Sequence, residues 1–137
     1  GIGLAAVQIG EAKRVIVMDL GDRDAETEEG AQAVKKPLYF VNPEIVWSSE
    51  ETVPYEEGCL SVPGMRGIVP RYQHLHYAGF DQFGHKVDRL VSGFHARVVQ
   101  HECDHLIGKL YPMRVRDFTK FGYTEILFPN ISSVEDD

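Results

Sequence analysis

Two histidines and a glutamate late in the chain have the spacing of a metal-binding motif. His101 and His105 are four positions apart, and Glu102 directly follows the first of them. On an α-helix, side chains four positions apart lie on one face, so both imidazoles can bind the same ion. Glu102 can then lie beside the ion and act as a base. For this short pattern alone, the alternative is a surface helix that carries two solvated histidines.

A thiol upstream could complete such a site. Cys59 lies in the segment Glu57-Gly-Cys-Leu-Ser61, where the glycine favours a turn. Thiolate sulfur and imidazole nitrogen are common protein ligands of zinc and related divalent ions. Three protein ligands would leave a fourth position for water, which is typical of a catalytic site rather than a structural one. The alternative for Cys59 is a buried thiol that packs as a small apolar side chain.

The other cysteine in the sequence, Cys103, is expected to pack in this second way. It lies two positions beyond His101, about 200° around the helix, and therefore points away from the face that carries the histidines. Two cysteines are too few for a typical disulfide scaffold in a chain of 137 residues. The cysteine usage instead favours a reducing compartment.

The opening residues, Gly1-Ile-Gly-Leu-Ala-Ala-Val-Gln8, allow a competing interpretation. They contain G-x-G-x-x-A, a form of the dinucleotide-binding fingerprint, and Asp19 lies near the position where that fingerprint expects an acid. The fingerprint also requires a preceding strand and a complete crossover helix. No strand precedes it in this sequence, and only residues 5–13, interrupted by Gly10, are available for the helix. A nucleotide site is therefore disfavoured, and the other simple alternative is that the glycines form turns.

Taken together, these three segments resemble the signature motifs of the peptide deformylase family. The family pattern G-x-G-(L/I/V)-A-(A/S)-x-Q is met by Gly1–Gln8, E-G-C-(L/I/V)-S by Glu57–Ser61, and Q-H-E-x-(D/N)-H by Gln100–His105. The similarity extends from Gly1 to about Phe128. It implies a hydrolase that removes the formyl group from N-formylmethionyl peptides and nascent proteins and releases formate.

The resemblance also implies one divalent metal ion per chain, bound by Cys59, His101 and His105. Ferrous iron would be the native metal, with zinc, nickel or cobalt as substitutes. The ligand set alone does not choose among these metals. Zinc generally binds such ligands more tightly than iron, so metal supply must decide.

The same resemblance implies further roles. Glu102 would take a proton from the attacking water and return it to the departing amine. The side chain of Gln8 and the backbone N–H of Leu60 would stabilise the oxyanion that forms on the formyl group. The residues expected to contact the substrate are Ile2, Gly3, Glu57, Gly58, Arg66, Phe94 and Val98.

Some of these substrate contacts can be specified further. Phe94 and Val98 fall on the helix face of the two histidines and are expected to line a pocket for the methionine side chain. The peptide backbone is expected to add as a strand along the segments after Gly3 and beside Gly58. Arg66 matches a family arginine near the pocket mouth, with an exposed surface charge as the alternative.

Arg97 departs from the family pattern, which commonly has an apolar residue at this helix position. It falls near the face that carries the two histidines. Its long side chain would either reach past the rim of the pocket or mark the edge of the buried face.

Two other functions fit parts of the sequence. A zinc metallopeptidase can carry the same H-E-x-x-H motif, but usually takes its third ligand from downstream. Residues 106–128 contain no histidine, and Glu125 falls in a separate predicted helix. Outside enzymes, a non-catalytic, metal-stabilised binding module would keep the metal ligands and would need neither Glu102 nor Gln8.

The length fits a single domain over residues 1–137, with a frayed tail expected over residues 129–137. The resemblance implies that the usual N-terminal segment of the family is missing from it. Apolar residues make up 43% and charged residues 26%, and the formal net charge is −7. This acidity argues against direct binding of nucleic acid. No apolar run approaches the roughly 20 residues of a membrane span. We expect a monomer in the bacterial cytoplasm or an organelle, acting on peptides or ribosome-associated nascent chains.

The order of the predicted elements favours an α+β fold with largely antiparallel sheets around one central metal-binding helix that carries H-E-x-x-H. The helix is predicted over Gly93–Ile107, with Ser92 as its N-cap and Gly108 as its terminator. Strands are predicted over residues 14–20, 38–41, 44–50 with a partner at 52–55, and a hairpin of 74–78 with 85–91.

The remaining segments are predicted as turns and connections. Pro63-Gly64 is expected to close the turn that carries the cysteine. Residues 21–36 are expected to form an acidic connection. Residues 117–128 are predicted to form a short C-terminal helix that Pro129 ends.

Overall fold

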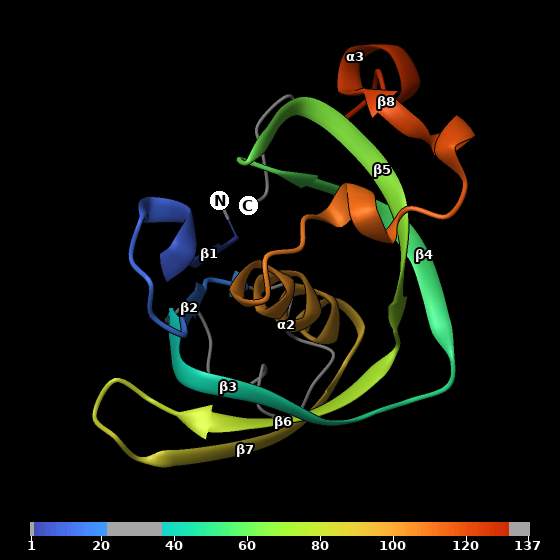
Figure 1. Cartoon of the computed structure of the whole chain (residues 1–137). Helices are drawn as coiled ribbons and strands as arrows, with labels where there is room; N and C mark the ends of the chain where they lie inside the picture. Colours follow the sequence, from blue (N-terminus) through green and yellow to red (C-terminus); the bar gives the residue numbers. More distant parts are fainter. Residues whose placement is uncertain (1, 22–36, 132–137) are drawn as a thin grey trace.

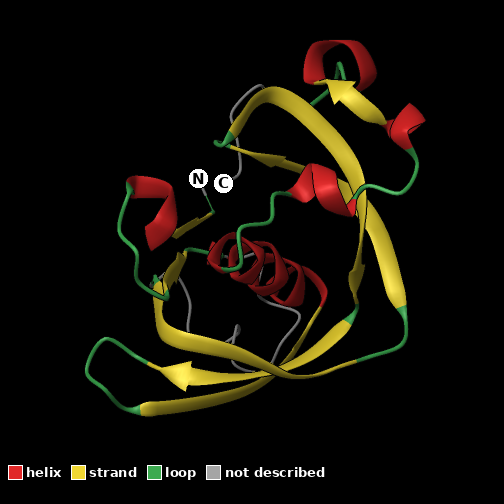
Figure 2. Ribbon diagram, in the orientation of Figure 1, coloured by secondary structure: helices red, strands yellow, loops and turns green. Residues whose placement is uncertain are grey.

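Two antiparallel sheets flank a single long helix in the computed structural model, which describes residues 2–21 and 37–131 (Figure 1). The five-stranded sheet has the order β1-β2-β3-β6-β7, and the three-stranded sheet has the order β4-β5-β8. Helix α2, with 14 residues, packs against strands of both sheets and lies between them (Figure 2). The predicted mixed fold with antiparallel sheets is confirmed.

The boundaries of the elements show where each signature segment lies. The strands are β1 (Gly3–Ala5), β2 (Val15–Met18), β3 (Leu38–Ser48), β4 (Thr52–Cys59), β5 (Val62–Tyr72), β6 (His74–Phe80), β7 (Lys86–Ser92) and β8 (Phe121–Tyr123). The helices are α2 (Gly93–Leu106) and the short α3 (Thr124–Leu127), with 3-10 helices η1 (Ala6–Ile9), η3 (Tyr111–Arg114) and η4 (Phe118–Lys120). The first segment thus spans β1 and η1, the second lies at the end of β4, and the third lies in α2.

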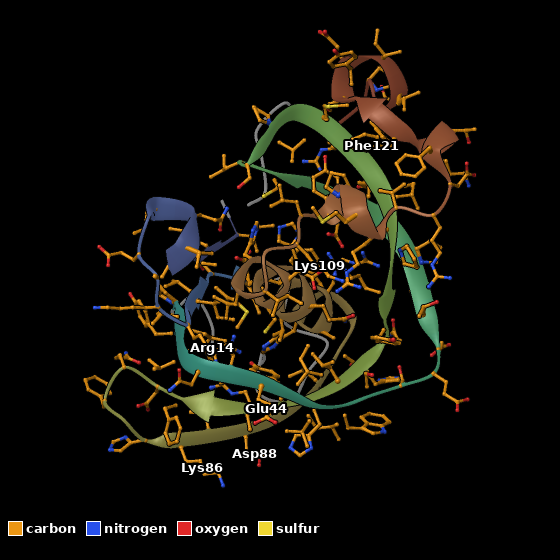
Figure 3. The ribbon with its side chains drawn as sticks, viewed as in Figure 1. Arg14, Glu44, Lys86, Asp88, Lys109 and Phe121 are labelled. Carbon is orange, nitrogen blue, oxygen red and sulfur yellow. The ribbon has the colours of Figure 1, made fainter. Side chains whose placement is uncertain are left out.

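The larger sheet has one face toward α2 and one toward solvent. Alternate side chains of a strand point to opposite faces, and Leu75 and Tyr77 of β6 are fully buried in the core cluster shared with α2. Glu44 of β3 and Lys86 and Asp88 of β7 are exposed on the outer face (Figure 3). This alternation fixes the strand register, because a slip of one residue would turn the buried side chains toward solvent.

The hairpin and the helix match the sequence predictions. Strands β6 and β7 pair along their whole length, and the Asp81 side chain in the turn accepts hydrogen bonds from the backbone N–H groups of Phe83 and His85. Ser92 is the N-cap residue of α2, although its side chain makes no capping hydrogen bond. Gly108 follows the helix with a φ of 77°, a conformation that favours glycine.

The region from residue 38 to residue 55 differs from the prediction. Leu38–Ser48 is one strand, because a register shift between Val41 and Glu44 accommodates Asn42, whose φ is 51°. The predicted pairing of residues 44–50 with 52–55 is wrong. Strand β3 pairs with β6, whereas β4 pairs with β5 in the other sheet. The chain therefore passes from one sheet to the other at this point, which a local hairpin pattern does not reveal.

Two further local predictions are wrong. Pro63-Gly64 lies inside β5, and the turn after Cys59 consists of Leu60 and Ser61. The predicted C-terminal helix is instead η4, β8 and α3. Strand β8 pairs with β5 at Gly67, where an added Cβ would lie 2.9 Å from a ring carbon of Phe121. This long-range fit favours a strand over a local helix.

The opening segment lacks the context of a dinucleotide site. Strand β1 pairs antiparallel with β2, in the register Gly3 to Met18. A dinucleotide fingerprint requires parallel strands joined by a crossover helix, and here only η1 separates them. The rejection of that interpretation is confirmed.

Some predictions fall outside the described residues. These are the acidic connection over residues 22–36 and residues 132–137 of the predicted tail. Within the part of the chain that is described, no helix combines the length and the apolar composition that a membrane crossing requires.

Candidate metal and catalytic site

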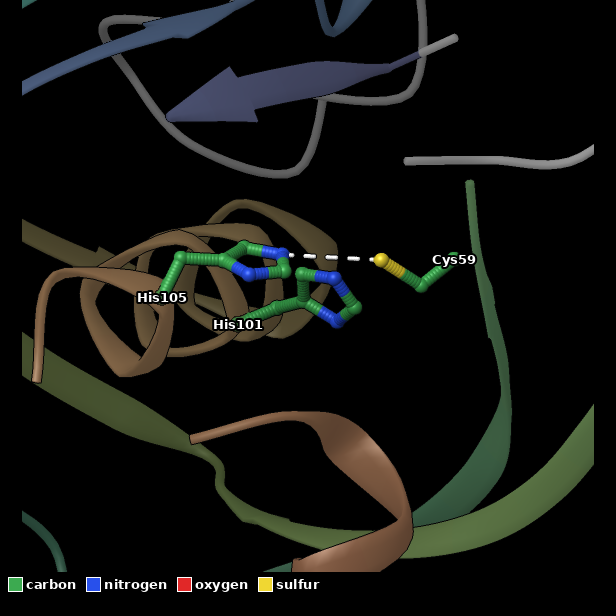
Figure 4. A group of neighbouring side chains, drawn as sticks. All are labelled: Cys59, His101 and His105. Carbon is green, nitrogen blue, oxygen red and sulfur yellow. Dashed lines mark hydrogen bonds between the residues drawn. The ribbon is translucent and has the colours of Figure 1, made fainter. Parts of the chain in front are cut away.

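Cys59, His101 and His105 come together between the end of β4 and α2 (Figure 4). Their ligand atoms all lie within 4.8 Å of one another, and the Sγ atom of Cys59 lies 3.5 Å from Nε2 of His105. All three residues are buried. One sulfur and two imidazole nitrogens within this distance form a donor set suited to zinc, iron or a similar divalent ion. The residues present therefore fit a single metal ion.

Local structure explains why these residues meet. His101 and His105 are one helical turn apart in α2, and their ring centroids are 5.0 Å apart. Cys59 reaches them from the end of β4, after a register shift against β5 between Glu57 and Cys59. The helical repeat thus aligns the two histidines, and the irregularity in β4 brings Cys59 to them from a distant segment.

The Glu57 carboxylate fixes the orientation of His101. Its Oε1 atom lies 2.9 Å from Nδ1 of His101. With Nδ1 donating in this hydrogen bond, His101 would bind a metal through Nε2. Such an outer carboxylate sets the tautomer of a ligand histidine and increases its basicity.

Glu57 is itself held by two arginines in a buried network. Arg71 donates to it from Nε at 2.9 Å and from Nη2 at 3.0 Å, and Arg97 donates from Nη1 at 2.6 Å. Burial alone would raise the pKa of Glu57, but the hydrogen bond from His101 and the charge of Arg71 outweigh it and hold the pKa well below its usual range. Glu57 is therefore a carboxylate anion that supports the site.

The environment of Cys59 favours its thiolate form. Burial opposes ionisation, yet hydrogen bonds with His101 and His105 outweigh it and lower the pKa of the thiol to about 6. The backbone N–H of Ser61 also donates to Sγ at 3.4 Å. The thiolate is the form of cysteine that binds metals.

Gln8 approaches the thiolate from η1, which directly follows β1. Its Oε1 atom accepts a hydrogen bond from the backbone N–H of Ala5 at 2.8 Å, which fixes the orientation of the amide. Its Nε2 atom then lies 3.3 Å from Oγ of Ser61 and 3.9 Å from Sγ of Cys59. The structure therefore brings the predicted Gln8 to the site, with its donor atom toward it. Leu60 lies in the intervening turn, and the residue is 54% exposed.

The other residues of the third segment attach α2 to its surroundings. The Gln100 side chain exchanges two hydrogen bonds with the backbone of Tyr72. Asp104 accepts hydrogen bonds from Arg71 at 2.7 Å and from Arg114 at 2.8 and 3.0 Å. Glu102 is fully buried on the same helix. This segment therefore carries both the ligands and the contacts that hold them in place.

Cys103 lies apart from the ligand group. It packs against the core cluster shared by α2 and the five-stranded sheet. Burial raises the pKa of its thiol to about 12, so it stays protonated at neutral pH. The prediction that it packs as an apolar residue agrees with this position.

Most of the predicted substrate residues line two hollows beside the ligands. The first, which we call the site hollow, is narrow, with a volume of about 20 Å³, and is lined by Ile2, Glu56, Glu57, Gly58, Phe94, Arg97, Val98 and His101. The second has a volume of about 260 Å³ and is lined by Ile2, Gly3, Leu4, Val17, Asp19 and Leu60. Ile2 belongs to both, so the two hollows adjoin at this residue.

Two predictions about arginines need correction. Arg66 is 4% exposed and lies on β5 opposite Gly122 of β8, so the exposed-charge alternative is wrong, while its place near the pocket mouth stays a prediction. The unpredicted pairing with β8 explains its burial. The substrate contact of Glu57 stays a prediction: Glu57 borders the site hollow, and its carboxylate accepts hydrogen bonds from His101 and two arginines. Arg97, at 7% exposed, turns inward to Glu57 instead of reaching past a rim.

Comparison with known families bears directly on this arrangement. Residues 1–121 match the family model described as polypeptide deformylase. The chain belongs to the polypeptide deformylase family. All three signature segments lie inside the matched range.

Individual deformylases support the same assignment. Peptide deformylase 2 of Ralstonia nicotianae is 54% identical over 137 residues, which cover all of this chain and 76% of that protein. The crystal structure of the Thermotoga maritima deformylase matches with a TM-score of 0.74 and 36% identity, covering 85% of this chain and 71% of that one. The Synechococcus elongatus deformylase, solved in complex with actinonin, matches with a TM-score of 0.75 and 35% identity over 88% of this chain and 59% of that one.

The sequence interpretation missed the residues that support the ligands. Arg71 links Glu57 to Asp104, and Ser61 contacts both Gln8 and the thiolate. Arg71 lies in a strand without a motif, so nothing in the local sequence marks it. Asp104 lies inside the third signature segment, and this position could have indicated that it supports the ligands.

The role of Glu57 leads to a first prediction. Replacing Glu57 with Gln keeps the side-chain shape but removes the anion that orients His101 and neutralises Arg71 and Arg97. We expect metal affinity to fall about 10–100-fold, the usual cost of losing a supporting carboxylate. Competition with a chelator of known affinity measures this loss. Glu44→Gln, on the exposed outer face, is the control, and equal affinity in both variants would contradict the role.

Proposed function

We propose that this chain hydrolyses the N-formyl group of N-formylmethionyl peptides and nascent proteins, and releases formate. The observation that supports this most directly is the convergence of the Cys59, His101 and His105 ligand atoms, with the Gln8 amide beside the thiolate. Family membership gives the reaction class, and the arrangement of side chains accounts for how the chain would perform it.

The proposed chemistry divides among a few residues. The metal would be bound by Cys59, His101 and His105, and when bound it lowers the pKa of water and polarises the carbonyl under attack. Glu102, next to a ligand histidine, takes the proton of the attacking water and delivers it to the departing amine nitrogen. The formyl C–N bond breaks as that nitrogen is protonated. The native metal in this proposal is ferrous iron, with zinc, nickel or cobalt as substitutes.

The oxyanion that develops on the formyl oxygen requires hydrogen-bond donors. Gln8 is suited to this role because Ala5 fixes its carbonyl oxygen and so directs its amide N–H groups toward the site. The backbone N–H of Leu60 adjoins the ligand Cys59 and is the second proposed donor. Donors held in place before the reaction stabilise the transition state without reorganisation.

Sheet edges provide a path for the peptide. Among the described strands, β1 and β4 each stand at an edge of their sheet, so one side of each strand has no neighbouring strand. An extended peptide can add to such an edge through backbone hydrogen bonds. We propose that the substrate runs past Gly3 and Gly58 in this way and places its methionine side chain against Phe94 and Val98.

Measurement of formate release tests the proposed deformylase activity. Protein purified without oxygen and loaded with iron should release formate from an N-formylmethionyl peptide and should leave the unformylated peptide intact. A zinc metallopeptidase would cleave the unformylated peptide, and a non-catalytic binding module would release neither product. Action at the ribosome, a monomeric state and a reducing compartment stay predictions.

The proposed oxyanion donor leads to a second prediction. Gln8→Leu should reduce turnover about 10²–10³-fold, as for the loss of a single oxyanion donor. Metal content should stay unchanged, because Gln8 is not one of the ligands. Steady-state kinetics of formate release and metal analysis of the same sample measure the two quantities. Gln73→Leu is the control variant and should turn over normally. Normal turnover by Gln8→Leu would contradict the proposed role of Gln8 as an oxyanion donor.

A further inference from the structure

The ring of Tyr111 is buried beside the metal ligands, although no signature segment contains it. Tyr111 begins η3, which packs against β4 and β5 (Figure 1). It is 1% exposed and belongs to the buried cluster that also contains Cys59, Val69 and Val115. A side chain from outside the three signature segments thus shares its packing with the ligand thiol.

The Tyr111 ring lies nearly parallel to the imidazole of His101. The ring planes differ by 19° and the centroids are 6.4 Å apart, within the range of offset-stacked aromatic pairs. Glu57 holds Nδ1 of the same imidazole at 2.9 Å, and the His105 ring meets it at 68°. The hydrogen bond fixes one atom of the imidazole, whereas a neighbouring ring restricts rotation about the bond to Cβ, a torsion with a broad energy minimum. The two contacts together set the direction of Nε2.

Tyr111 is itself held from the C-terminal side. The Phe121 ring of β8 meets it nearly edge-on, with centroids 6.2 Å apart and an interplanar angle of 68°. Phe121 packs in turn against Phe118, at 6.1 Å, and against Gly67 of β5, where an added Cβ would collide with it. A row of aromatic side chains therefore runs from β8 to a ligand of the proposed metal.

We propose that the Tyr111 ring, held by Phe121, is a positioning group for the metal ligand His101. The inference rests on the metal site of the proposed deformylase function and extends the support of that site to η3 and β8. Without the ring, a cavity would form beside the imidazole, because buried side chains close such spaces only partly. The imidazole would then adopt more than one orientation, and the entropy lost in ordering it would oppose metal binding.

Three variants separate the ring from its hydroxyl and from general stability. Tyr111→Phe removes the hydroxyl and keeps the ring. Tyr111→Leu removes the ring and keeps an apolar side chain. Phe40→Leu makes the same kind of loss in the other core cluster, where Phe40 is 1% exposed and packs on Tyr77 instead of on a ligand. This control thus weakens core packing without reaching the metal site.

The measured quantities are the affinity of the purified chain for Co²⁺ and the visible absorption spectrum of the bound ion. Cobalt is the probe because its d–d bands report the number and arrangement of its ligands. Tyr111→Leu should bind Co²⁺ about tenfold more weakly, the lower end of the cost of losing a group that orients a ligand. The position or intensity of its bands should also change. Tyr111→Phe and Phe40→Leu should keep the affinity and the spectrum of the unmodified chain.

Unchanged affinity and spectrum in Tyr111→Leu would overturn the proposal. Equal changes in Phe40→Leu would assign the effect to lost stability, and equal changes in Tyr111→Phe would assign it to the hydroxyl, so either result also overturns it. If Tyr111→Leu does not fold, Phe121→Leu removes the ring behind Tyr111 and should weaken Co²⁺ binding in the same direction. Normal Co²⁺ binding by that variant then overturns the proposal.

Failure of the deformylase reaction gives a different result. An unmodified chain that binds Co²⁺ but releases no formate from an N-formylmethionyl peptide rejects the proposed reaction, whereas weaker Co²⁺ binding by Tyr111→Leu still supports the positioning role. Formate release by the unmodified chain, together with unaltered Co²⁺ binding by Tyr111→Leu, rejects the role of Tyr111 alone.

Discussion

Replacing Glu102 with Gln should remove most of the turnover and leave the metal in place. The glutamine side chain has the same shape but cannot take the proton from the attacking water. General acid–base groups contribute about 10²–10⁴ in rate, and a loss in this range is expected for kcat. Glu102 is fully buried, so it is shielded from bulk water that could replace it as a base. Formate release by the metal-loaded variant measures the effect.

The matched control is Glu125→Gln, an exposed glutamate in α3. It should turn over normally. A metal-replete Glu102→Gln variant with normal turnover would show that another group moves the proton. Loss of metal from this variant would show that Glu102 is a ligand. Either result contradicts the proposed role.

Replacing Cys59 with Ser should have the largest effect on metal binding. A neutral hydroxyl replaces a thiolate, which is the charged ligand of the group. If three ligands share a binding free energy of about 10–16 kcal/mol, the loss of one corresponds to a factor of about 10³ in affinity. Titration with the metal against a competing chelator, by calorimetry or absorbance, measures the loss. Cys103→Ala is the control, since Cys103 packs in the core and should leave affinity unchanged.

The same experiment has a pH dependence with a defined direction. The thiol pKa of Cys59 is lowered to about 6, so the thiolate predominates above that pH. Below it, protons compete with the metal for the sulfur, and affinity should fall as the pH decreases. Equal metal affinity of the Ser variant and the unmodified chain would remove Cys59 from the ligand set.

The sequence was most informative where a pattern repeats within one element. The i, i+4 spacing of His101 and His105 requires only a helix, and α2 forms with nearly the predicted bounds. The hairpin of β6 and β7 likewise follows from alternation around a turn at Asp81. In both cases, the residues that decide the structure are close neighbours in the chain.

The missed features depend on contacts between distant segments. The pairing of β8 with β5 buries Arg66 and requires Gly67 to face Phe121. Neither property is visible within residues 117–128, where a helix was predicted. The network around Glu57 likewise joins β4, β5 and α2 through Arg71 and Arg97. Such a charge network forms only after these elements have packed, so no local pattern predicts it.

The separation of the ligands along the chain has a consequence for folding kinetics. Cys59 lies 46 positions before His105 and belongs to the smaller sheet, whereas the histidines belong to the helix. A complete ligand set therefore exists only after the smaller sheet has closed on α2. Interactions that form after the transition state slow unfolding and leave the folding rate nearly unchanged. Added metal should thus lengthen the lifetime of the folded chain in denaturant without accelerating its refolding.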